Sequence, residues 1–135
     1  MSRRDATLRS QQTIDKLYRE GVTYHGAYVI CIVRRAASGQ RHVLFVTSRR
    51  VGNAVRRNRA KRLMREAYRS VADALPPDRI HIAWIARATC AQSGMNEIRE
   101  DMLRIMERTG LIPSGTERAQ GVRRARTGER GPETA

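Results

Sequence analysis

Apolar residues near the start of the chain recur at helical spacing. Ile14, Leu17 and Tyr18 fall at i, i+3 and i+4, which places them on one side of an α-helix. Ser10 is a suitable N-cap before them, and Gly21 is a suitable residue just past the end of the helix. The pattern therefore predicts a short helix that ends just before Gly21.

A longer apolar stripe lies in the middle of the chain. Asn53 can cap a helix that runs from Ala54 to about Ala74, because the prolines at 76 and 77 cannot continue it. A third stripe, over residues 95–108, predicts a last helix. The stripes consist of Ala60, Leu63, Met64, Ala67, Tyr68 and Val71 in the middle helix and of Ile98, Met102, Ile105 and Met106 in the last one.

Three segments between these helices are rich in β-branched and apolar residues. Ala27–Val33 is mostly apolar, which predicts a strand with both faces largely covered, and His42–Thr47 predicts a second strand. Asp78–Arg87 alternates and then runs apolar, which predicts the third strand. Ser38-Gly39-Gln40 marks a hairpin-like turn between the strands predicted at Ala27–Val33 and His42–Thr47. Val22–Tyr24 is compatible with an additional short strand.

These elements predict an α+β fold, a single-domain α-β sandwich in the order α-β-β-(β)-α-β-α. We expect one domain over residues 1–113, followed by a disordered basic tail over 114–135, where almost nothing can be buried. A strand–helix–strand path around the middle helix implies parallel neighbours in the sheet, and such crossovers are usually right-handed.

The charge of the chain is strongly positive. The 27 basic and 13 acidic residues give a formal charge of +14 and a pI near 11.4, so binding to nucleic acid is the default expectation. All the basic residues except Lys16 and Lys61 are arginines, whose guanidinium groups suit phosphates and exposed bases.

The positive charge is concentrated in residues 49–69, which hold nine basic side chains and one acid, Glu66. A solvated helix face normally alternates in sign, so this face repels itself unless a polyanion lies against it. A membrane surface is disfavoured because the apolar stripe lacks bulky wedge residues. The polar side of the helix carries Arg57, Asn58, Lys61, Arg62, Arg65 and Arg69.

The two cysteines, Cys31 and Cys90, lie far apart in the sequence and form no CxxC pair. We interpret both as reduced core thiols. The first ten residues have no apolar leader region, and no apolar run approaches the length of a membrane span. The expected location is the cytoplasm, with Arg3, Arg4 and Arg9 forming a small basic arm.

The basic segment resembles a known signature. Val-Gly-Asn-Ala-Val at 51–55, Arg-Asn-Arg at 57–59 and Lys-Arg at 61–62 are similar to the RNR motif of the bacterial ribonuclease P protein component. Residues 13–21, 80–87 and 95–108 resemble the first helix, last strand and last helix of that family.

The resemblance implies an α+β sandwich similar to a ribosomal-protein domain, with a left-handed β-α-β crossover. It implies a protein subunit that binds the catalytic RNA subunit and the single-stranded 5′ leader of precursor tRNA, raises substrate affinity and lowers the metal requirement. Hydrolysis is then expected from the RNA subunit with Mg²⁺, and no cofactor, metal, membrane or DNA is expected on the protein.

The resemblance also implies two sets of site residues. Members of the first set are expected to touch the RNA subunit or the precursor, and members of the second to line a leader cleft between the first helix and the sheet. Because Arg57, Arg59 and Arg62 project from the polar face of the middle helix, we expect the fold to survive their replacement by alanine. The first set is Arg49, Arg50, Asn53, Arg56, Arg57, Asn58, Arg59, Lys61, Arg62, Arg65 and Arg69, and the second is Ile14, Tyr18, Tyr28 and Cys31.

The same residues allow two alternative hypotheses about function. A ribosomal protein or RNA chaperone of similar fold would share the basic helix without needing the motif. A stand-alone nuclease lacks an acid–base constellation, because His25, His42 and His81 are isolated in the sequence. The acids Glu97, Glu100 and Asp101 are expected to neutralise Arg99 and Arg104 rather than to bind metal.

Overall fold

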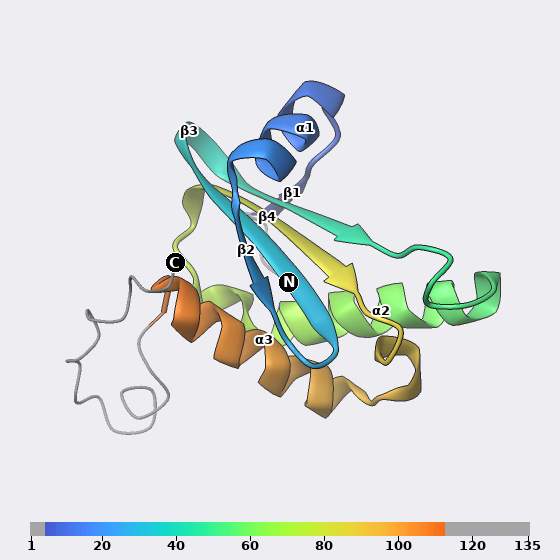
Figure 1. Ribbon diagram of the computed structural model, residues 1–135. Coiled ribbons are helices and arrows are strands. Elements are labelled where there is room, and N and C mark those ends of the chain that lie inside the picture. Colours follow the sequence, from blue (N-terminus) through green and yellow to red (C-terminus); the bar gives the residue numbers. More distant parts are fainter. Residues whose placement is uncertain (1–4, 113–135) are drawn as a thin grey trace, which may run out of the picture.

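The fold has three layers. In this computed structural model, which describes residues 5–112, a sheet separates α1 (Gln11–Glu20) on one face from α2 (Ala54–Val71) and α3 (Met95–Thr109) on the other (Figure 1). The mixed α+β architecture predicted from the sequence is therefore confirmed.

The sheet has four strands, of which the third is bent. These are β1 (Asp5–Thr7), β2 (Val22–His25), β3 (Val29–Val46) and β4 (Asp78–Ala86). Strand β3 turns back on itself around Gly39, which has a φ of 95° and lies where the sequence predicted a turn (Figure 1). Such a positive φ favours glycine, because it lacks a Cβ.

Both arms of β3 pair with β4. Residues 29–35 run antiparallel to β4, whereas the pairs of the second arm go from His42 opposite His81 to Val46 opposite Ile85, so that the two residue numbers rise together. The chain thus leaves the second arm, passes through α2 and returns beside that arm in the same direction. The predicted crossover is present, and its left-handed sense stays a prediction.

The helix ends follow from their capping residues. The Ser10 hydroxyl accepts a hydrogen bond from the Thr13 N–H at 3.3 Å, and the Asn53 side chain accepts one from the Arg56 N–H at 3.0 Å. These contacts satisfy N–H groups that have no partner within the first turn. Helix α2 passes into a 3₁₀ turn, η1 (Ala72–Ala74), so the predicted end of the helix is close to the observed one.

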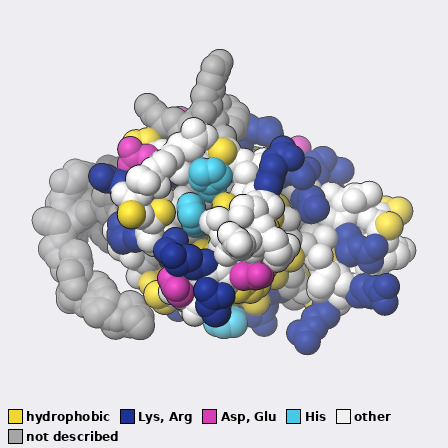
Figure 2. Space-filling view, turned by 90° about the horizontal axis from the view of Figure 1, so that it is seen from above, with side chains coloured by type: hydrophobic (Ala, Val, Ile, Leu, Met, Phe, Trp, Pro, Cys, Tyr) yellow, Lys and Arg dark blue, Asp and Glu magenta, His cyan; other side chains and the backbone are white. Residues whose placement is uncertain are grey.

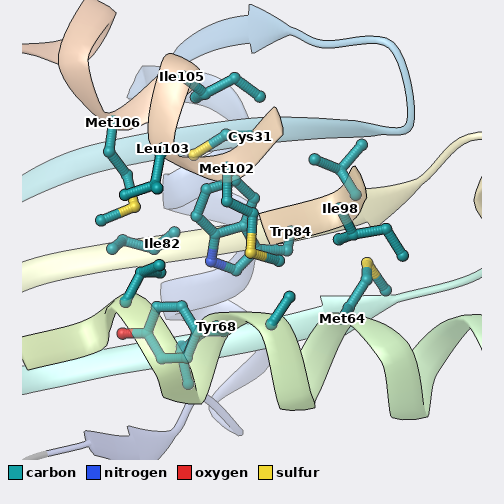
Figure 3. Packing of buried hydrophobic residues seen from close by; sticks show 14 of the residues in the cluster. Cys31, Met64, Tyr68, Ile82, Trp84, Ile98, Met102, Leu103, Ile105 and Met106 are labelled. Atoms are coloured by element: carbon teal, nitrogen blue, oxygen red, sulfur yellow. The ribbon is translucent and has the colours of Figure 1, made fainter. Parts of the chain in front are cut away.

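The main core lies between the sheet and helices α2 and α3. Trp84 of β4 is fully buried at its centre, where it contacts Tyr68 of α2 with ring centroids 6.3 Å apart (Figure 3). Every residue of the two predicted helix stripes is buried, as their spacing required. A smaller cluster on the other face packs α1 onto the sheet and consists of Leu8, Leu17, Ile32 and Ala83.

The beginning of the described chain differs from the sequence-based expectation. Strand β1 pairs in parallel with Arg41–Val43 of β3, where the sequence indicates only a basic arm. Three residues are too few to show a period of two, so this strand has no local signal. The short strand at Val22–Tyr24 is confirmed as β2. Residues 1–4 and the predicted tail at 114–135 lie outside the described residues.

Arg41 is buried, and its guanidinium group forms hydrogen bonds to the backbone. Its Nη1 donates hydrogen bonds to the carbonyl oxygens of Ala72 (3.0 Å), Leu75 (3.2 Å) and Pro76 (3.0 Å). These oxygens lie at the C-terminal end of α2, where a positive charge is favourable. Arg41 therefore ties the end of the basic helix to the sheet.

Candidate RNA-binding surface

Helix α2 presents its polar side to solvent. Dark-blue basic side chains gather at the end of the molecule where α2 begins, with few acids among them (Figure 2). Of the predicted RNA-binding set, Arg56, Arg57 and Lys61 are half-buried, and the exposed members are Arg49, Arg50, Asn53, Asn58, Arg59, Arg62, Arg65 and Arg69.

Two arginines of the first turn of α2 form hydrogen bonds to the turn that precedes the helix. Arg57 Nη1 donates to the Gly52 carbonyl oxygen at 2.8 Å, and Arg56 Nε donates to the Val51 carbonyl oxygen at 3.3 Å. Val51 itself is buried in the main core. The Val-Gly-Asn portion of the motif thus builds a tight entry to the helix, and the two guanidinium groups remain partly open to solvent beside it.

Arg59 is not a free side chain on the polar face. Its Nε donates to the carbonyl oxygen of Ala91 at 2.8 Å, and its Nη2 donates to that of Ser93 at 3.2 Å. Both acceptors belong to the segment around η2 (Cys90–Gln92), just before α3. Arg59 therefore joins α2 to this segment, and that its replacement leaves the chain folded stays a prediction.

The ion pairs among the described residues leave the cations of α2 uncompensated. They join Arg34 to Glu20, Arg79 to Asp78, Arg99 to Glu100 and Arg104 to Asp101, and none of these four pairs involves α2. Glu66 is the helix's sole acid. The exposed face therefore carries a concentrated positive potential suited to a polyanion.

The predicted leader cleft is only partly assembled. Ile14 packs against the smaller core cluster under α1, and Tyr18 is 46% exposed at the surface of the same helix. Partial burial raises the pKa of the Tyr18 phenol. These two residues do lie on the α1 side of the sheet, with an aromatic ring accessible to solvent.

The other two residues predicted for the leader cleft, Cys31 and Tyr28, lie at the main core. Cys31 is 2% exposed inside the main core (Figure 3), and burial raises the pKa of its thiol. Tyr28 also packs against the main core. Placing Cys31 in the cleft was wrong, because strand alternation turns it toward α2 and α3. The residues on the α1 side are instead Ile32, Leu44 and Ile85, which the alternation of β3 and β4 identifies once the face covered by α1 is known.

Two of the histidines that are isolated in the sequence meet in space. The rings of His42 and His81 form a T-shaped contact with centroids 5.3 Å apart, on neighbouring strands. Burial lowers the pKa of His81, and the nearby His42 and Arg34 lower it further. No sequence signal points to this pair, because their residue numbers are far apart and only the pairing of β3 with β4 joins them.

Asp101 stabilises the fold through backbone hydrogen bonds, in addition to the charge neutralisation that the sequence predicted. Its buried carboxylate accepts hydrogen bonds from the backbone N–H groups of Ala27 (3.0 Å), Tyr28 (2.8 Å) and Val29 (3.1 Å), besides its predicted pair with Arg104. A Cβ at Gly26 would collide with the same carboxylate. Among the described residues, no group of His, Cys, Asp and Glu side chains is arranged to hold a metal ion.

Comparison with known proteins decides the family. The family model described as "Ribonuclease P" matches residues 2–110. The chain belongs to the ribonuclease P protein family. It is 29% identical over 102 residues to the ribonuclease P protein component of a Nitratiruptor species, covering 76% of this chain and 90% of that one.

Two further comparisons agree. The ribonuclease P protein component of Chloroflexus aurantiacus is 30% identical over 114 residues, which is 84% of each chain. The fold resembles that of a Staphylococcus aureus RNase P protein mutant with defective mRNA degradation activity, with a TM-score of 0.69 at 17% identity over 78% of this chain and 89% of that one.

Membership makes the chain a subunit of an endoribonuclease that processes tRNA precursors, with hydrolysis performed by the holoenzyme. The ribosomal-protein and RNA-chaperone readings are thereby set aside. Within the described residues, none of the helices is both long and apolar enough to span a membrane.

Proposed function

We propose that the polar face of α2 binds the RNA subunit of ribonuclease P. The observation that carries this proposal is a helix with one side buried and the other carrying cations that take no part in the ion pairs found within residues 5–112. Neutralising phosphates releases counterions, so such a face contributes affinity wherever an RNA backbone lies along it. The exposed members of the set named above supply the contacts, with Arg62, Arg65 and Arg69 aligned along the helix.

The second part of the proposal places the 5′ leader of precursor tRNA on the α1 side of the sheet. Tyr18 offers a half-exposed ring there, and Leu44 and Ile85 are only partly buried beside α1. Unpaired bases stack on exposed aromatic side chains with little dependence on sequence. The protein thereby holds a part of the substrate that mature tRNA lacks.

Hydrolysis is assigned to the RNA subunit with Mg²⁺. The protein contributes positive charge and substrate contacts, which raise precursor affinity and lower the Mg²⁺ concentration that the RNA needs. Two of its acids hold backbone N–H groups: Asp101 accepts from those of Ala27, Tyr28 and Val29, and Glu97 accepts from the Gly94 N–H at 2.6 Å. The compartment in this proposal is the bacterial cytoplasm, where precursor tRNA is made.

Precursor-tRNA cleavage at low Mg²⁺ tests the proposal. A bacterial ribonuclease P RNA is assayed alone, with this protein, and with an Arg62→Ala/Arg65→Ala variant; Arg99→Ala/Arg104→Ala in α3 removes the same charge elsewhere. We expect stimulation by the wild-type chain and the α3 variant, and little by the α2 variant. Cleavage by the purified protein alone, or equal stimulation by all three proteins, would contradict it.

A further inference from the structure

A small hollow lies between the N-terminal strand and the basic helix. Its volume is about 170 Å³, below the roughly 300–1,000 Å³ of pockets for drug-sized ligands, so it suits a single flat group. It is on the α2 side of the sheet, whereas α1 and the proposed leader surface are on the other side. Its walls come from Thr7 of β1, Val43 and Phe45 of β3, and Arg65, Tyr68 and Arg69 of α2.

The hollow has an aromatic wall. Phe45 is half-buried and meets the Tyr68 ring edge-on, with centroids 5.7 Å apart, which fixes its orientation. The guanidinium carbon of Arg65 lies 6.0 Å from the Phe45 centroid, over the ring. Arg65 is itself exposed, so it can turn away from the ring or offer its own plane for stacking.

The charge around the hollow is positive. Arg65 and Arg69 are one helical turn apart on α2 and both are exposed at its rim. None of the lining residues that the structure describes is acidic, and Glu66 of α2 does not line the hollow. Thr7 adds a hydroxyl that can donate and accept hydrogen bonds at the opposite wall.

We propose that this hollow binds one unstacked nucleotide of an RNA that lies along α2, with its base against Phe45 and Arg65 and its phosphate at Arg69. Proteins recognise unpaired RNA by stacking bases on aromatic rings and guanidinium planes and by pairing phosphates with arginine. All three groups meet here within one concave site. The inference rests on the RNA partnership proposed above and adds to it a second base-binding site, separate from the leader surface.

The chain has a single phenylalanine, and this allows a direct test. In the full-length protein with ¹³C-labelled phenylalanine, the ring signals report on Phe45 alone. Two probes are titrated: a pentaadenylate, and an abasic ribose-phosphate oligomer of the same charge. We expect a ring-current shift of the Phe45 signals with pentaadenylate and little change with the abasic oligomer.

Substitutions at Phe45 supply an affinity readout. In a Tyr18→Ala background, which removes the aromatic ring of the proposed leader surface, Phe45→Leu keeps an apolar side chain but should weaken pentaadenylate binding about 5-fold or more and leave abasic binding unchanged. Phe45→Tyr in the same background should keep the preference for bases. Melting temperatures establish whether each variant is folded. If Phe45→Leu is unfolded, the ring signals of Phe45 in the wild-type protein alone test whether the hollow binds a base.

The outcomes separate this proposal from the previous one. Equal Phe45 shifts with both oligomers, or no shift while pentaadenylate binds, would overturn the nucleotide site and leave the role of α2 intact. Failure of α2 to affect ribonuclease P RNA would instead appear in the cleavage assay, in which all three proteins retain Phe45.

Discussion

Arg59 and Ala91 lie 32 residues apart in sequence and are joined by a 2.8 Å hydrogen bond from the guanidinium Nε to the carbonyl oxygen. The second arginine of the Arg-Asn-Arg motif therefore connects α2 to the segment that leads into α3. The same guanidinium lies near Cys90, whose pKa is raised to about 11 by burial and by Asp101 against the opposing effect of Arg59.

Replacing Arg59 should cost stability. We expect Arg59→Ala to lower the free energy of unfolding by about 1–2 kcal/mol, because the carbonyl oxygens of Ala91 and Ser93 lose a charged donor. Denaturant unfolding measures this change. Arg62→Ala removes the same charge from an exposed position. An equal loss of unfolding free energy in that variant would show that the hydrogen bonds of Arg59 do not stabilise the fold.

Arg62→Ala should act on RNA binding instead. Loss of one phosphate contact should reduce the slope of log affinity against log salt by about 0.7–0.9. Binding to ribonuclease P RNA at several salt concentrations gives the slope, and Arg99→Ala in α3 is the control of equal charge. An unchanged slope in Arg62→Ala would show that no phosphate lies at this position.

Asp101→Asn should destabilise the loop between β2 and β3. The carboxylate serves three backbone N–H groups, and a neutral amide with one carbonyl oxygen cannot replace it, so we expect a loss of about 2 kcal/mol or more. Unfolding of Glu100→Gln, an exposed neighbour, provides the comparison. Faster amide exchange at Ala27–Val29 in Asp101→Asn alone would locate the effect.

His81 should make stability depend on pH. Because its pKa in the folded state lies below the ordinary value near 6.5, the unfolded chain binds the proton first as pH falls. The contribution is therefore fully present above about pH 6.5 and is lost as pH drops through the lowered folded value. Unfolding free energies at pH 7.5 and 5.5 should differ less in His81→Gln than in the wild type. A wild-type pH slope in that variant would exclude His81 as the cause.

Tyr18 tests the leader surface. Tyr18→Ala should weaken binding of precursor tRNA by about 1–3 kcal/mol if a base stacks on the ring, with little effect on mature tRNA. Its 46% exposure favours a ring that is free to bind over one that only packs α1. An equal loss for both RNAs, together with a large fall in melting temperature, would mean that Tyr18 serves the fold.

Local sequence patterns determined much of this protein. The spacing of Leu63, Met64 and Tyr68 settled which side of α2 is buried, and Ser10 and Asn53 marked where helices begin, because periodicity and capping involve residues within a few positions of each other. The motif at 51–62 likewise sufficed to indicate the family, since all its residues are consecutive or nearly so.

Tertiary structure decided which distant residues meet. The bend of β3 around β4 paired His42 with His81, and it set the alternation that buries Cys31 and leaves Leu44 on the α1 side. The contacts of Arg59 with Ala91 and of Asp101 with Ala27 span 32 and 74 residues. No pattern along the chain specifies such partners, because a hydrogen bond depends on the position of two atoms in space and only the packing of helices on the sheet brings them together.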